Sequence, residues 1–150
     1  MPMSLRVAVV VLVLLLAVPV LAQDQRAGGR FDKRLLVAEN MFLTESEANA
    51  FWPIYDAYQQ DLDRIYDRIS KVIVEYVRAY TDNVLTDEQA RALTDQVLDI
   101  DEAEASIART YAVKLDAILP GKKVARYLQI ERKIRATLRY ELADKIPLVK

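Results

Sequence analysis

The stretch TESEANAFWPIYDAYQQDLDRIYDRISKVIVEYVRAY, residues 44–80, decides the fold class of this chain. At 100° of rotation per residue, its apolar and aromatic side chains fall in one arc, and most charged side chains fall outside it. The spacing alternates between three and four residues, which suits packing against another long helix at a shallow angle. We therefore expect one long amphipathic helix. The arc comprises Phe51, Tyr55, Tyr58, Leu62, Ile65, Ile69, Ile73, Tyr76 and Tyr80.

Two residues near the start of this helix are unusual. Pro53 lies about two turns inside it, where proline removes one backbone hydrogen bond and is expected to bend the axis. Trp52 lies at the edge of the arc, beside Pro53. The sequence leaves two interpretations of Trp52 open, one as a side chain that fixes the bend and one as an exposed contact.

Two helix starts carry the same capping signal. In a capping box, a threonine hydroxyl accepts a hydrogen bond from a free backbone N–H, and a Glu or Gln three residues later reaches back to the cap. Thr44 with Glu47 fits this pattern, and so does Thr86 with Gln89. Each threonine follows a leucine that can act as a hydrophobic staple. These leucines are Leu43 and Leu85.

Three further segments have a helical period. A short one begins at Phe31 and stops at Leu43. A longer one follows Thr86 to about Leu119, and Glu104 falls near the middle of its apolar arc, where a carboxylate needs a partner. The last begins at Pro120-Gly121 and runs to about Lys145. Its stripe comprises Val124, Tyr127, Ile134, Leu138 and Leu142.

These segments predict an all-α fold with one short and three long amphipathic helices. The connections between them are short, so successive helices are expected to lie antiparallel in a hairpin or bundle arrangement. We expect residues 31–150 to form a single helical domain, preceded by a flexible lead-in over residues 23–30.

Residues 1–22 have the pattern of a cleavable secretory signal. Arg6 precedes an apolar run that begins at Val7, and Ala22 provides a small residue at the expected cleavage site. The run is shorter than the roughly 20 residues needed to span a bilayer. We therefore expect a periplasmic protein with no stable membrane anchor after cleavage, although a permanent anchor is the alternative.

The composition excludes several classes of protein. The chain has 150 residues, of which 53% are hydrophobic and 29% charged, with 3 Gly, no Cys, no His and a net charge of -1. These values exclude a disordered chain, a collagen-like chain and a disulfide scaffold. Without Cys or His there is no thiolate nucleophile, no histidine relay and no soft-metal site.

A carboxylate cluster is the one group that suggests acid–base or cation chemistry. It comprises Asp99, Asp101, Glu102 and Glu104. Catalysis would need a pair with separated pKa values in a pocket, and a calcium loop would need glycine-turned spacing. The simpler interpretation is a solvated acidic face with one buried, paired Glu104. We expect no catalytic residue, no cofactor and no metal.

Charge is sorted between the last two helices. Residues 86–104 hold seven acidic side chains against Arg91 alone, and residues 121–139 hold seven basic side chains against Glu131 alone. One interpretation is mutual neutralisation between packed neighbours. The other is a basic surface that receives acidic or unfolded partners. The candidate face for such partners comprises Arg126, Arg132, Arg135 and Arg139.

Leu85-Thr86-Asp87-Glu88-Gln89 matches the Leu-Thr-x-x-Gln (LTXXQ) motif. The chain thereby resembles the Spy/CpxP family, the small periplasmic helical chaperones and envelope-stress regulators of Gram-negative bacteria. Residues 43–47 are similar to a first copy of the motif, with Glu47 in place of the final Gln. The block around Trp52 and Pro53 looks more like an uncharacterised branch near that family.

The resemblance implies a bent, cradle-like antiparallel homodimer whose concave, basic and partly apolar face holds clients without ATP. It makes Leu43, Thr44, Leu85, Thr86 and Gln89 the structural motif residues. Metal-sensing relatives use histidines, which this chain lacks.

Three functional hypotheses follow. The first is a periplasmic, ATP-independent chaperone or stress accessory that binds unfolded envelope proteins. The second is an interaction module for one specific partner, such as the sensor of a signalling system. The third, an enzyme, has the weakest support. Nucleic acid is not an expected partner of a secreted, slightly acidic chain.

Overall fold

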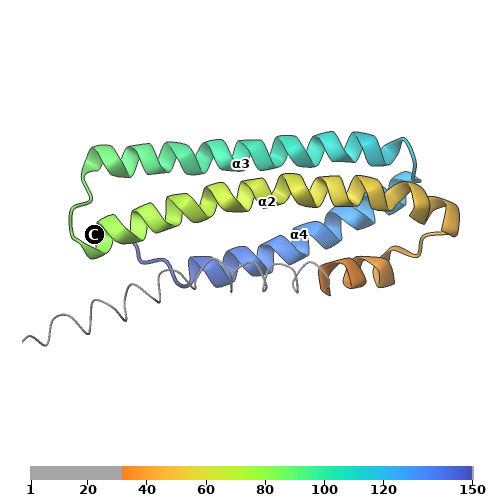
Figure 1. Ribbon diagram of the computed structural model, residues 1–150, viewed down its shortest axis with the longest axis horizontal. Helices are drawn as coiled ribbons and strands as arrows, with labels where there is room; N and C mark the ends of the chain where they lie inside the picture. Colours follow the sequence, from red (N-terminus) through yellow and green to blue (C-terminus); the bar gives the residue numbers. More distant parts are fainter. Residues whose placement is uncertain (1–31, 150) are drawn as a thin grey trace, which may run out of the picture. The chain divides into compact units, whose positions relative to one another are not determined.

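The computed structural model describes residues 32–149 of the chain. The predicted signal peptide of residues 1–22 and the lead-in of residues 23–30 lie outside these residues, as does Phe31. The described part contains helices and no strand, and the predicted all-α class is confirmed. A short helix covers residues 32–41. The three long helices are α2 (Glu45–Thr81), α3 (Asp87–Asp116) and α4 (Gly121–Ala143) (Figure 1).

The chain divides into two compact units, one ending at Phe42 and one beginning at Leu43. In the first unit, the Asn40 side-chain amide donates to the carbonyl of Leu36, at 2.8 Å. Phe42 has a φ of 48°, in the left-handed region that an aromatic residue rarely adopts, and this conformation ends the short helix. The single domain expected over residues 31–150 stays a prediction.

In the second unit, α3 runs antiparallel to both α2 and α4 (Figure 1). The core between α2 and α3 is built on Ile65 and Val72 from one helix and Leu93 and Ile100 from the other. Each of these side chains is at most 6% exposed. The amphipathic patterns of α2 and α3 therefore meet as expected, although Val72 rather than Ile73 is the buried residue near the end of α2.

Helix α4 reaches α2 in a different way. No Cα atom of Gly121–Ala143 lies within 8 Å of one in Glu45–Thr81, and long side chains cross the space. The Gln59 amide donates to the Tyr127 hydroxyl at 3.2 Å and to a Glu131 carboxylate oxygen at 3.0 Å. About one helical turn after Glu131, Arg135 donates to the Tyr58 hydroxyl at 3.2 Å. A polar layer thus joins these two helices.

The predicted apolar stripe of α4 is wrong in its second half. Leu138 and Leu142 are exposed, at 48% and 39%, whereas Glu131 and Arg135 are buried, at 0% and 8%. The buried stripe continues from Tyr127 in steps of four residues, which directs the two charged side chains toward α2. Hydrogen-bond partners on α2 satisfy the polar groups, so the helix keeps this orientation.

Aromatic rings fill the region where α2, α3 and α4 come together. Phe51 and Tyr127 meet edge to face with ring centres 5.1 Å apart, and Tyr58 stacks on Tyr111 at 4.7 Å. Trp52 contacts the Phe51 ring edge to face at 5.0 Å. Helix α2 is continuous through Pro53, and the bend expected there stays a prediction.

The chain after α4 is attached to the far end of α2. The Tyr76 hydroxyl donates to the carbonyl of Pro147 at 2.7 Å, which brings the tail beside the α2–α3 connection (Figure 1). In that connection Asn83 has a φ of 54°, a left-handed conformation that asparagine tolerates and that ends α2. Within residues 32–149, no helix has the length and apolar character needed to cross a membrane.

Candidate binding groove between α3 and α4

The two predicted capping boxes are confirmed. Thr44 accepts a hydrogen bond from the backbone N–H of Glu47 at 3.3 Å, and its own N–H donates to the Glu47 carboxylate at 2.7 Å. The corresponding distances for Thr86 and Gln89 are 3.2 and 3.1 Å. Leu85 packs against the core between α2 and α3. The two threonines therefore start α2 and α3, and Leu85 anchors the beginning of α3 to the core.

Glu47 has a second partner, which the sequence did not reveal. The Lys123 ammonium group donates to its carboxylate at 2.5 Å and links the start of α2 to the first turn of α4. Lys123 and the backbone N–H of Thr44 hold the pKa of Glu47 below its usual value. A capping box accepts Glu or Gln at this position, so the local sequence gives no signal of the link to Lys123.

Glu104 is paired as predicted, and its partners come from α4. Its side chain is 13% exposed and lies 3.2 Å from Arg135 and 2.5 Å from Arg139. Arg139 also donates to Asp101 at 2.9 Å. Burial alone would lower the pKa of Arg135, but Tyr58 and the nearby carboxylates outweigh it and raise that pKa.

These contacts correct the expectation of an exposed face of four arginines. Arg135 is buried and committed to Glu104 and Tyr58, so it is part of the interior. Arg139 remains accessible, but its guanidinium group is held by Glu104 and Asp101. Arg126 and Arg132 are exposed. The acidic and basic helices thus neutralise each other in part. The expectation failed because the charge pattern along the chain does not reveal how α4 is rotated about its axis.

Tyrosines surround this ionic layer. The Tyr66 hydroxyl is buried without a hydrogen-bond partner, and burial, followed by the negative charge of Glu104, raises its pKa to about 12. The Tyr111 hydroxyl donates to Asp61 at 2.6 Å. Burial and this bond raise the pKa of Tyr111 to about 12, while the same bond lowers the pKa of Asp61.

A groove of about 490 Å³ lies between α3 and α4. Its apolar lining, called the floor below, is mostly small and comprises Ala105, Ala108 and Ala112 from α3 and Leu128 from α4. Four arginines and two carboxylates complete the lining. They are Arg109, Arg132, Arg135, Arg139, Asp101 and Glu104.

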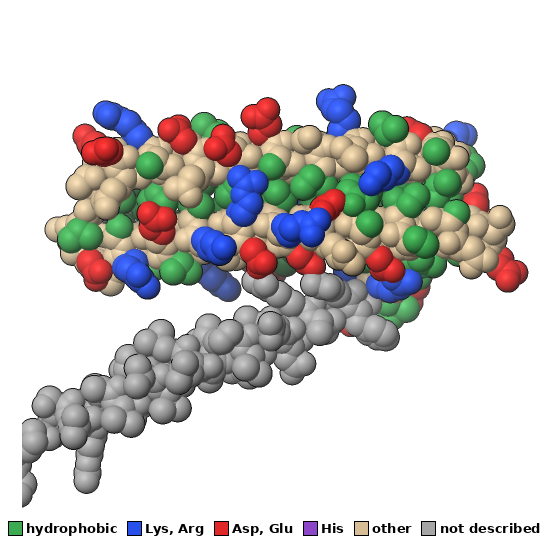
Figure 2. All heavy atoms as spheres, turned by 45° about the horizontal axis from the view of Figure 1, so that its top comes forward, with side chains coloured by type: hydrophobic (Ala, Val, Ile, Leu, Met, Phe, Trp, Pro, Cys, Tyr) green, Lys and Arg blue, Asp and Glu red, His purple; other side chains and the backbone are tan. Residues whose placement is uncertain are grey.

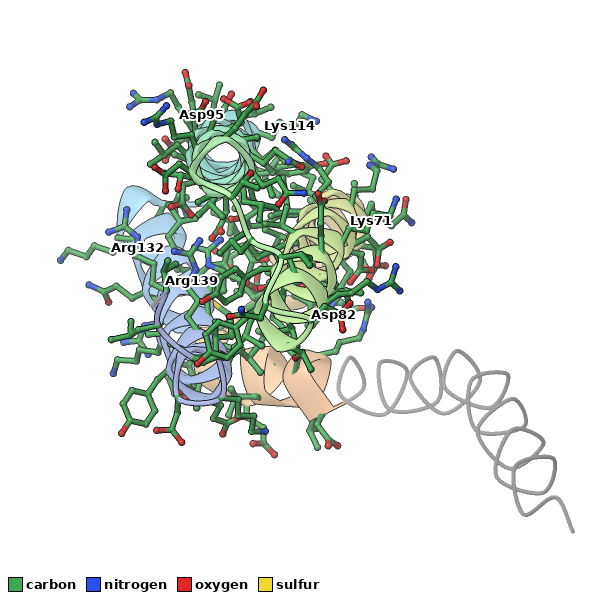
Figure 3. All side chains as sticks on the ribbon, turned by 90° about the vertical axis from the view of Figure 1, so that its left-hand side faces the viewer. Lys71, Asp82, Asp95, Lys114, Arg132 and Arg139 are labelled. Atoms are coloured by element: carbon green, nitrogen blue, oxygen red, sulfur yellow. The ribbon has the colours of Figure 1, made fainter. Side chains whose placement is uncertain are left out.

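The charges of the groove are not balanced. Arg135 and Arg139 are paired with the two carboxylates, as described above. Within residues 32–149, Arg109 and Arg132 have no hydrogen-bond or ion-pair partner. A view along the helices shows α2, α3 and α4 at the corners of a triangle, with Arg132 and Arg139 on α4 (Figure 3). The groove therefore offers unpaired positive charge beside an apolar floor.

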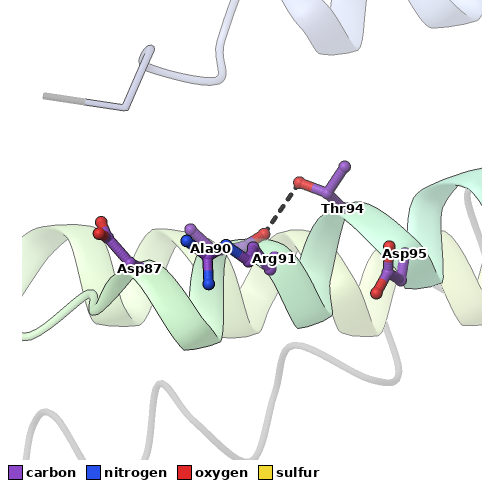
Figure 4. A pocket seen from close by; sticks show the side chains of 5 residues that line it. All are labelled: Asp87, Ala90, Arg91, Thr94 and Asp95. Carbon is purple, nitrogen blue, oxygen red and sulfur yellow. Dashed lines mark hydrogen bonds between the residues drawn. The ribbon is translucent and has the colours of Figure 1, made fainter.

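A second depression, of about 480 Å³, lies on α3 alone (Figure 4). Asp87, Arg91 and Asp95 line it at successive turns of the helix. The Thr94 hydroxyl donates a hydrogen bond to the Ala90 carbonyl at 2.8 Å. Because one helix supplies all of its lining, its polar groups do not converge on a ligand. In residues 32–149, no three His, Cys, Asp or Glu side chains are grouped so that they could hold a metal ion.

The face of the described residues that Figure 2 shows is mixed in character. Basic and acidic side chains alternate with hydrophobic patches over one face of the molecule (Figure 2). Val74 and Val113, two of the exposed aliphatic side chains of α2 and α3, are 58% and 65% exposed. Comparison with protein-family models, with curated proteins and with solved structures gives no match.

Proposed function

We propose that this chain is a periplasmic, ATP-independent chaperone-like or envelope-stress accessory protein, a non-enzymatic member of the Spy/CpxP (LTXXQ) group or of a branch near it. It binds unfolded or partner envelope proteins, and it acts as a homodimer. The signal-like residues 1–22 support the compartment, and the two Leu-Thr capping boxes support the family.

The groove between α3 and α4 is the observation that carries the binding proposal. It combines the apolar floor of Ala105, Ala108 and Ala112 with the unpaired guanidinium groups of Arg109 and Arg132. Apolar contact and long-range positive charge suit weak binding of partner segments that carry both apolar and acidic side chains. The exposed valines of α2 and α3 extend the apolar contact area.

Light scattering of two unrelated denatured proteins tests this function. We expect the wild-type protein, expressed from its full-length chain, to suppress aggregation of both at near-equimolar ratio. Arg109→Ser with Arg132→Ser should weaken suppression several-fold by removing the unpaired charge of the groove. The matched control is Arg68→Ser with Arg91→Ser, which removes two exposed arginines outside the groove and should leave suppression unchanged.

The alternative is an interaction module for one specific partner, such as a sensor or regulator. The observation that favours this module is the fixed set of charges along the groove, which would select one ligand over others. If the wild-type protein suppresses neither aggregation reaction, the chaperone proposal is abandoned. A single stoichiometric partner captured from envelope extract would then support the module.

A further inference from the structure

We infer that the groove between α3 and α4 receives an acidic amphipathic helix of a partner protein. This inference rests on the proposed binding function and names the chemistry of the segment that is bound. The occupant has an apolar stripe with carboxylates on both sides of it.

The shape of the groove suits a helix. Ala105, Ala108 and Ala112 follow one another at three and four residues, so their methyl groups form one line along α3. Between Asp101 and Ala112 the lining of α3 covers about 17 Å, or about three helical turns. Small side chains on this line let another helix approach closely, and Leu128 of α4 provides a second apolar wall.

The positive charge of the groove favours a negatively charged occupant. Arg109 is on α3 and Arg132 is on α4, so unpaired positive charge lies on both sides of the apolar floor. The remaining two arginines are held by Glu104 and Asp101. A helix with carboxylates flanking an apolar stripe would place negative charge against both unpaired groups. A basic helix would meet Arg109, Arg132 and the accessible Arg139, while the two carboxylates are already paired.

The arrangement of the arginines favours a long ligand, such as a helix, over a small anion. The two paired guanidinium groups are already held by carboxylates, and the two unpaired ones come from different helices. A small anion gains most from several donors that converge on one point, as in bidentate recognition. The floor of alanine and leucine side chains adds apolar contact that only a larger ligand would use.

Fluorescence anisotropy with labelled synthetic peptides of about 18 residues tests the inference, because isolated helices shorter than about 12 to 15 residues are marginal in water. The probes are an amphipathic Glu/Leu/Ala peptide, its Lys-for-Glu counterpart, and a scrambled peptide with the acidic composition but no stripe. The protein titrated with these peptides is the one obtained by expressing the full-length chain. We expect only the first peptide to bind well, and more weakly at about 0.5 M salt than at about 0.15 M salt.

Variants locate the site. Arg109→Ser with Arg132→Ser should raise the dissociation constant about tenfold, whereas the Arg68→Ser, Arg91→Ser control should not change it. Ala105→Trp should block the floor, and Ala50→Trp on α2, also an exposed alanine, should leave binding intact. Circular dichroism of each variant checks that the helices are retained.

Several results would overturn the inference. Equal binding of the Lys peptide would show that the groove does not select negative charge, and equal binding of the scrambled peptide would show that it does not select an amphipathic helix. Unchanged binding in the groove variants would show that the peptide binds elsewhere. Sedimentation showing that Arg109→Ser with Arg132→Ser dissociates a dimer would assign the groove to a second copy of the chain. Aggregation suppression without peptide binding defeats this inference alone, and peptide binding without suppression defeats the chaperone proposal.

Discussion

Glu104 shows how one residue in an amphipathic pattern can reveal an interior contact. A carboxylate in an apolar arc predicts a buried partner, because an unpaired buried charge is too costly. The structure supplies two partners, Arg135 and Arg139. The charge pattern of the sequence places both in a candidate partner-binding face and leaves neutralisation by the acidic helix as the alternative. The need for a partner could be predicted, but its identity depended on the rotation of α4.

Glu104→Ala should lower the free energy of unfolding by about 3 kcal/mol. Arg135 is only 8% exposed and would lose its carboxylate while remaining in the interior. Urea denaturation followed by circular dichroism measures the change. The control is Glu102→Ala, an exposed neighbour on the same helix. Equal losses in the two variants would show that the Glu104 pair contributes no more than a surface contact.

At the level of the helices, the starts of α2 and α3 were the most predictable features. Capping depends on side chains within a few residues, so Thr44 and Thr86 could be recognised from their local sequence. The face that α4 buries could not be predicted in the same way. Ile134, Leu138 and Leu142 form a plausible stripe, but the hydrogen bonds of Glu131 and Arg135 to α2 override it.

Thr44→Ala and Thr86→Ala should each lower the free energy of unfolding by about 1 kcal/mol, because a backbone N–H at the helix start loses its acceptor. Thr94→Ala is the matched control. The Thr94 hydroxyl bonds to the Ala90 carbonyl inside α3, and alanine is the better helix former. The control should therefore be neutral or slightly stabilising. Similar losses in all three variants would contradict the capping role.

At the level of the whole molecule, the class of fold followed from periodicity, whereas the groove did not. Ala105, Ala108 and Ala112 lie outside the arc that packs on α2, and alanine side chains at such positions give no signal of their own. Only the placement of α4 beside them creates a concave surface that both Arg109 and Arg132 line. Non-local packing of this kind leaves no mark on the local pattern.

The buried tyrosines predict loss of stability at alkaline pH. The pKa values of Tyr66 and Tyr111 are raised from 10.0 to about 12, chiefly by burial. The unfolded chain therefore releases these protons first. Stability is fully present below pH 10 and is lost as the pH rises from 10 to about 12. Tyrosinate absorbance and far-ultraviolet circular dichroism, followed in parallel, should show ionisation and helix loss together.

Tyr66→Phe is the control for this alkaline transition. Its hydroxyl has no hydrogen-bond partner, so the variant should keep its stability at neutral pH and lose less of it above pH 10. If all 8 tyrosines ionised near pH 10 while the helices persisted, the burial of Tyr66 and Tyr111 would be wrong.

The bond between the Tyr76 hydroxyl and the carbonyl of Pro147 determines where a reporter group can be attached. Because the chain has no cysteine, Val149→Cys would create a unique position for a fluorophore. The dye would be restrained near the α2–α3 connection while the tail is attached, and would rotate freely after Tyr76→Phe. A single label could thus report on fraying of this end of the helical hairpin in real time.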